Sequence, residues 1–120
     1  MMELTKKEEE IMTFFWEKGP LFVKEIQNFY GAPQPHINTL STMVRILEDK
    51  GMLGHESIAK SYRYYPLVDK QNFRKNTLKE VIYKYFDNSY LNAVSSLVEE
   101  EDISVSELKK LIDQVEKENN

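Results

Sequence analysis

The sequence predicts a mainly α-helical protein with a small β-wing, in which a winged helix-turn-helix domain precedes a three-helix tail. Three observations predict this class. Helical patterns of apolar residues fill the chain up to Lys50, two β-prone runs around a polar turn follow, and helical spacing returns from Leu67. Because 120 residues hold one ordinary domain or a compact module with an appendage, we expect a domain over residues 1–67 and a tail over 68–120.

The first helix is predicted by a capping box, Thr-Lys-Lys-Glu at residues 5–8, in which Thr5 and Glu8 each satisfy a backbone N–H. Gly19 and Pro20 end this helix. A short β-prone run and a second helix, residues 23–30, come next and stop at a break over residues 31–35. The apolar side chains of the first helix form one stripe: Ile11, Met12, Phe15 and Trp16.

The third helix is predicted from about Pro35 or His36 to Lys50, with Gly51 as its C-cap. Its core stripe consists of Ile37, Leu40, Val44 and Leu47.

The opposite face of this helix carries short polar or basic side chains, and no acidic residue occurs between Glu25 and Glu48. Such a face indicates contact with a partner, whereas a merely solvated helix carries a mixture of Glu and Lys. The alternative is that its Ser, Thr and Asn residues only cap the helix start. The face consists of Asn38, Thr39, Ser41, Thr42 and Arg45.

Residues 53–58 and 62–66 predict a β-hairpin around a polar turn, which after a third helix is a wing. We expect Tyr64 or Tyr65 to lie in the core. Lys60 and Arg63 are placed to contact phosphate or a minor groove, although lone basic residues on a hairpin can also be simply solvated.

The tail has too many apolar positions to stay exposed and too few residues for a core of its own. Its third helix opens with a second capping box at residues 104–107. The simplest partner is the tail of a second chain, and packing back onto residues 1–67 is the alternative. The expected dimerisation residues are Phe73, Val81, Tyr85, Leu91, Val94, Leu97, Leu108, Leu111, Ile112 and Val115.

Composition excludes several functions. The chain has no cysteine and two histidines, His36 and His55, so we expect no disulfide, no metal site and no cofactor. It also lacks a Gly-rich phosphate loop and any acid–base constellation, which argues against an enzyme. No apolar run is long enough to cross a bilayer and no signal peptide is apparent, so we expect a cytoplasmic protein without membrane insertion.

The order of elements predicts a sequence-specific DNA-binding repressor. In a helix-turn-helix the second helix lies in the major groove of double-stranded DNA, and a homodimer would bind an inverted-repeat operator. Arg45 suits guanine and Asn38 suits adenine. The net charge of −4 opposes DNA binding, so the rival hypothesis is a winged-helix module that binds proteins and not DNA.

Several stretches resemble the penicillinase-repressor family, also called BlaI/MecI/CopY. They are residues 38–53, the end of the wing at 64–67, the start of the chain at 4–16, and residues 90–103. The resemblance implies a homodimeric repressor of resistance or copper-homeostasis genes. Thr39 and Thr42 match the recognition-helix threonines of that family, whereas Asn38 and Ser41 stand where the staphylococcal β-lactam repressors carry Lys and Arg.

Two branches of this family are induced differently. The copper-responsive branch uses a C-terminal cysteine motif, which a chain without cysteine cannot supply. In the β-lactam branch a membrane sensor protease triggers cleavage in the tail. The resemblance places that cleavage between Ser96 and Leu97, matched in position but not in residue type, so proteolytic induction is a hypothesis for this chain.

Overall fold

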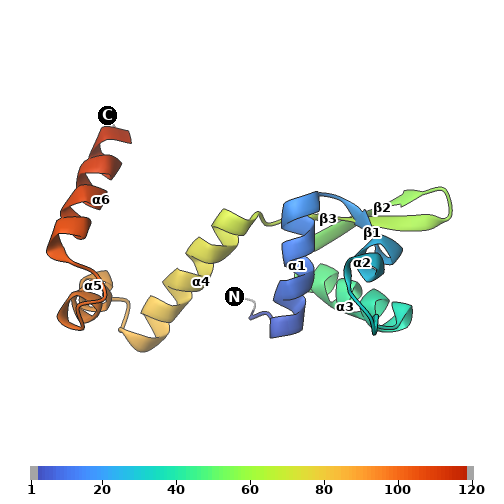
Figure 1. The fold of residues 1–120 in the computed structure, drawn as a ribbon, viewed down its shortest axis with the longest axis horizontal. Helices are drawn as coiled ribbons and strands as arrows, with labels where there is room; N and C mark the ends of the chain where they lie inside the picture. The colour runs from blue at the N-terminus through green and yellow to red at the C-terminus, as the bar shows by residue number, and fades with distance from the viewer. Residues whose placement is uncertain (1–2, 119–120) are drawn as a thin grey trace. The chain divides into compact units, whose positions relative to one another are not determined.

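The computed structural model describes residues 3–118. These residues form two compact units, which divide between Lys75 and Asn76. Helices and strands follow one another in the order expected for a winged helix-turn-helix and a helical tail (Figure 1). The elements are α1 (Lys6–Lys18), β1 (Leu21–Phe22), α2 (Val23–Phe29), α3 (Ile37–Asp49), β2 (Leu53–Ile58), β3 (Ser61–Pro66), α4 (Lys70–Tyr85), α5 (Tyr90–Glu99) and α6 (Val105–Glu118).

The capping box at the start of α1 is confirmed. The backbone N–H of Glu8 donates to Thr5 Oγ1 at 3.2 Å, and the backbone N–H of Thr5 donates to Glu8 Oε1 at 2.7 Å. Two N–H groups that α1 cannot satisfy internally are thereby bonded. The helix ends at Gly19, whose φ of 82° suits glycine better than other residues.

α3 starts slightly later than predicted, at Ile37, with His36 as its N-cap. His36 Nδ1 accepts the backbone N–H of Asn38 at 3.1 Å. At the other end Gly51, with φ of 81°, lies one residue beyond the C-cap Lys50. The N–H groups of Met52 and Gly51 donate to the carbonyls of Leu47 and Glu48, both at 2.9 Å, which is a Schellman ending.

The wing is present as a hairpin of β2 and β3, and β1 pairs with the other edge of β3. All pairs in this three-stranded sheet are antiparallel. Ile58 pairs with Ser61, so Ala59 and Lys60 form a two-residue turn, with Ala59 at φ of 54°. Leu21 pairs with Tyr64, which joins the segment after α1 to the strand after the wing turn.

The core of the first unit lies among α1, α2, α3 and the sheet. Tyr64 belongs to it, as predicted for one of the two neighbouring tyrosines. In the predicted stripe of α3, Ile37 is only half-buried, and the other three residues are fully buried. The core consists of Ile11, Met12, Phe15, Leu21, Ile26, Leu40, Val44, Leu47, Met52, Leu53 and Tyr64.

The first unit also holds the start of α4. Trp16 Nε1 donates to the carbonyl of Val68 at 2.9 Å, and the Trp16 and Phe73 rings lie 5.3 Å apart. Phe73, which the sequence places among the dimerisation residues, therefore has a partner within its own chain.

The second unit has a different character. Among the described side chains of residues 76–118, Ile82 is the one buried hydrophobic residue. Ser104 Oγ accepts the N–H of Glu107 at 3.0 Å, as half of the predicted second capping box requires. The large apolar side chains that stay exposed are Leu78, Val81, Tyr83, Tyr85, Tyr90, Leu91, Val94, Leu97, Val105, Leu111, Ile112 and Val115.

Candidate nucleic-acid interface

α2 and α3 form a helix-turn-helix whose turn is bonded to α2. Gln27 Nε2, on α2, donates to the carbonyl of Pro35 at 3.0 Å, just before α3 begins. Glu25 Oε1 accepts the N–H of Phe22 at 2.9 Å and holds the start of α2. Ile26 of α2 lies in the same core as Leu40 of α3. The second helix is thus braced by the first, as a recognition helix requires.

The polar face of α3 is open to solvent. Asn38, Thr39, Thr42 and Arg45 are exposed, and Ser41 is half-buried. Thr42 Oγ1 donates to the carbonyl of Asn38 at 3.0 Å, and Arg45 Nε donates to that of Ser41 at 3.3 Å. These bonds run within one helix, so both side chains can turn outward to a ligand.

The start of α3 is capped by His36, which lies outside this polar face. The N-cap supplies the side-chain acceptor for an otherwise unbonded N–H at a helix start. The proposal that the Ser, Thr and Asn residues of α3 serve only as caps is therefore not needed to explain how the helix begins.

An open groove of about 770 Å³ lies between the helix-turn-helix and the wing. Lys24 of α2 and Arg45 of α3 bring positive charge to its lining, and Glu25 brings one carboxylate. Most of the other lining residues are apolar or aromatic: Phe22, Val23, Ile37, Ile58, Ala59, Tyr62 and Tyr64.

The two basic residues of the wing differ in their surroundings. Lys60 is exposed in the turn. Arg63 is half-buried and donates from Nε to Glu56 Oε1 of β2 at 2.9 Å, so its charge is partly balanced within the hairpin. This pair could be anticipated, because a two-residue turn at 59–60 sets Glu56 opposite Arg63.

A second pair joins the wing to α3. His55 Nδ1 contacts Glu48 Oε2, and the His55 ring lies 4.5 Å from that of Tyr62. Burial, together with the negative charge of Glu48, raises the pKa of Tyr64. This contact between Glu48 and His55 was not predicted, because no local sequence pattern relates the two residues.

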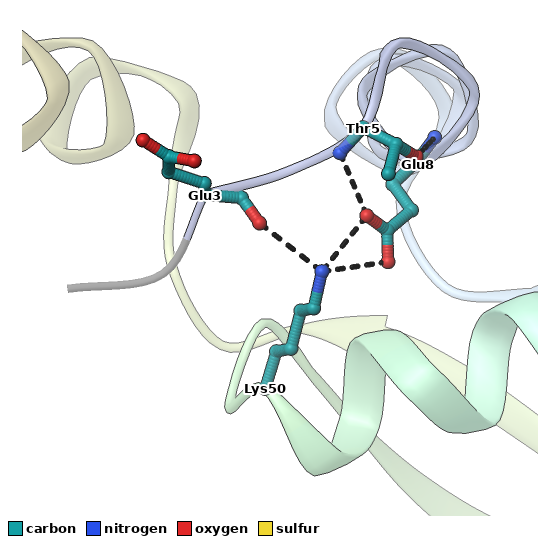
Figure 2. Close-up of polar contacts among 4 residues, drawn as sticks. All are labelled: Glu3, Thr5, Glu8 and Lys50. Atoms are coloured by element: carbon teal, nitrogen blue, oxygen red, sulfur yellow. Dashed lines mark hydrogen bonds and ion pairs between the residues drawn. The ribbon is translucent and has the colours of Figure 1, made fainter.

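Lys50 lies at the edge of the acid-free segment, but its charge is already paired. Its Nζ donates to Glu8 Oε1 at 2.9 Å and to Oε2 at 3.0 Å (Figure 2). This pair was not predicted from the sequence, since the two residues stand 42 positions apart. Among the lysines that flank the acid-free segment, Lys24 is the exposed one.

The remaining predicted residues lie in the tail. Ser96 is half-buried and Leu97 is 43% exposed, both within α5. Leu108 is half-buried, while Leu111, Ile112 and Val115 follow it on α6 at helical spacing and are exposed.

Two classes of site are not found in the described part of the chain. Residues 3–118 bring no three His, Asp or Glu side chains together in a way that could hold a metal ion. In the same residues no helix combines the length and the apolar character needed to cross a membrane.

Comparison with known proteins covers both units. The family model described as penicillinase repressor matches residues 4–117. The methicillin resistance regulatory protein MecI of Mammaliicoccus sciuri is 28% identical over 114 residues, and so is MecI of Staphylococcus aureus strain N315. Each alignment covers 91% of this chain and 89% of the relative.

Proposed function

Because the chain belongs to the penicillinase repressor family, it is a transcriptional repressor and not an enzyme, and we propose that it binds an inverted-repeat operator as a homodimer. The observation that carries this proposal is the polar face of α3. All of its residues except the half-buried Ser41 are exposed, none is acidic, and α2 and the core support the helix from behind.

The chemistry of this face suits base edges. Arg45 can donate two hydrogen bonds to guanine, Asn38 can bond adenine, and the methyl groups of Thr39 and Thr42 suit thymine. Lys60 and Arg63 assist from the wing by contacting phosphate. Because Arg63 is already paired with Glu56, its contact with phosphate should be weaker than that of Lys60.

A homodimer is supported by the exposed apolar residues of the tail. Leu91 of α5 is 77% exposed, Leu111 of α6 is 55% exposed, and many similar side chains accompany them. Exposed apolar surface of this extent marks an interaction site, and most soluble oligomers are symmetric dimers. Two joined copies would also offset the shortage of positive charge, since each supplies its own α3 to the DNA.

We also propose that the repressor is inactivated by proteolysis between Ser96 and Leu97, in a response to a membrane sensor protease. The exposed Leu97 side chain supports access to this segment. α5 must open locally before a protease can hold it in an extended form. Co-expression with a neighbouring sensor protease and its inducer should shorten the chain at this position. An intact chain under those conditions would refute cleavage.

Operator binding is tested by fluorescence anisotropy with the promoter region of the chain's own gene, titrated at two salt concentrations. We expect sequence-selective binding that weakens as salt rises, because phosphate contacts release counterions. A scrambled duplex of equal length is the control. Equal affinity for both duplexes would remove the operator proposal and favour a winged-helix module that binds proteins.

A further inference from the structure

The contact between Glu8 and Lys50 joins the first turn of α1 to the end of the recognition helix α3. Lys50 is the C-cap of α3, and its ammonium group has three acceptors: both carboxylate oxygens of Glu8 and the carbonyl of Glu3, the last at 3.1 Å (Figure 2). An ammonium group carries three N–H donors, so this arrangement satisfies all of them.

Glu8 is also fixed in place, by burial and by hydrogen bonds. It is the one buried charged residue among those described, and its side chain is 6% exposed. Besides Lys50, its carboxylate bonds the N–H of Thr5 and so belongs to the capping box of α1. Burial opposes ionisation, but the hydrogen bonds from Thr5 and Lys50 outweigh it and lower the pKa of Glu8.

Stability alone is a weak explanation for this pair. Capping requires only an acceptor, which an uncharged Gln would supply equally well. Taking the charge of Glu8 out of water costs free energy that its attraction to Lys50 barely repays, and ion pairs replaced by apolar residues often leave proteins no less stable. A fully bonded pair, with Glu8 buried and Lys50 half-buried, does restrict the relative placement of the two elements that carry it.

We propose that Glu8 and Lys50 are positioning residues that set the orientation of α3, and therefore of its base-reading face, relative to the rest of the domain. Lys50 stands about 18 Å along the helix axis from Asn38, at 1.5 Å per residue. Over that length a tilt of about 10° displaces the far end by about 3 Å, well beyond the tolerance of a precise binding site, which is roughly 0.5 Å.

The inference rests on the proposed operator binding, and a double variant tests it. Glu8→Gln with Lys50→Met removes both charges, and the Gln amide oxygen still accepts from the N–H of Thr5. We expect the full-length variant to keep its thermal unfolding midpoint within a few degrees but to bind the operator about tenfold more weakly. The single variant Lys50→Arg keeps a cation opposite Glu8, so it should keep most of the affinity of the unmodified chain. Unchanged affinity in the double variant would overturn the proposal.

The matched control is Glu9→Gln with Lys7→Met, which makes the same change of charge at exposed positions of the same helix. This control should bind the operator like the unmodified chain. If the Glu8 and Lys50 double variant fails to fold, Glu8→Gln replaces it, because the amide oxygen still accepts from Thr5 and Lys50. For Glu8→Gln we expect about threefold weaker binding, and unchanged binding would overturn the proposal.

A second readout does not depend on DNA. The chain has no cysteine, so spin labels can be attached after Glu17→Cys on α1 and Thr42→Cys on α3, with excess unlabelled chain suppressing distances between copies. We expect the interspin distance distribution to broaden or shift when Glu8 and Lys50 are replaced. An unmodified chain that binds no operator would refute the proposed function alone, whereas an unaltered distance distribution would refute the positioning role.

Discussion

The two units of this protein bury their apolar residues to very different extents. In the first unit Ile11, Met12, Ile26, Val44 and Leu47 are all 0% exposed. In the second unit most large apolar side chains are exposed, and Leu91 reaches 77%. Since apolar burial is the main favourable contribution to folding, the first unit has a complete core within one chain and the second does not. This difference supports the proposal that a second copy of the chain covers the exposed apolar residues of the tail.

The largest effect is expected from the core of the first unit. Phe15→Ala removes a ring that is 1% exposed, and such truncations cost about 3–5 kcal/mol of unfolding free energy. Urea denaturation monitored by Trp16 fluorescence measures this loss. Leu91→Ala, at an exposed position of the tail, serves as the comparison and should leave that transition unchanged. A loss below 1 kcal/mol for Phe15→Ala would show that this core is not what stabilises the domain.

A smaller effect is expected on dimerisation from Ile112→Ala. Ile112 is 49% exposed in the single chain, so about half of it is already covered before a dimer forms. Each copy should then lose about 1 kcal/mol of apolar burial and the dimer about 2 kcal/mol, or roughly 30-fold in dissociation constant. Sedimentation equilibrium measures this change. Lys110→Ala on the same helix is the control, and equal weakening by both would argue against an apolar interface.

Arg45→Ala tests the role of the first unit in DNA binding without altering the tail. Loss of one bidentate contact to guanine should weaken operator binding by about 1–3 kcal/mol, or roughly 5- to 150-fold. The mass of the dimer should stay the same, because Arg45 lies outside the tail. Arg74→Ala, an exposed residue of α4, is the control for net charge. If Arg45→Ala disturbs folding instead, Arg45 does not lie on the DNA-binding face of α3.

The smallest effect concerns pH. Burial raises the pKa of Glu8 in the folded chain, but hydrogen bonds from Thr5 and Lys50 outweigh this effect. The net result is a pKa below the ordinary value of 4.5. This contribution to stability is therefore complete above about pH 4.5 and is lost as the pH falls through the lowered value. The difference in urea midpoint between the unmodified chain and Glu8→Gln should shrink on acidification. A difference that stays constant from pH 7 to pH 3 would contradict this account.

Local signals made most of the first unit predictable from the sequence. The capping box at Thr5 and Glu8 marked the start of α1, and Gly19 and Gly51 marked helix ends because their backbone conformations suit glycine. The polar turn at Ala59 and Lys60 marked the hairpin. These features depend on residues close in sequence, so periodicity and turn chemistry suffice to find them.

Contacts between distant segments were not predictable in the same way. The bonds from Lys50 to Glu8 and from Trp16 to Val68 join residues 42 and 52 positions apart. Which partners meet depends on how the helices pack, and no local pattern encodes that. For this reason no partner was predicted for Lys50, and Phe73 was predicted only in the tail interface.

The central claim is that two copies, each with a complete reading domain, are joined by their tails on one operator. Sedimentation of the chain with a fluorescent inverted-repeat duplex and, separately, with a single half-site duplex tests it most directly. The account predicts two chains on each inverted repeat and at least 100-fold weaker binding to the half-site. One chain per duplex, with equal affinity for both duplexes, would contradict it.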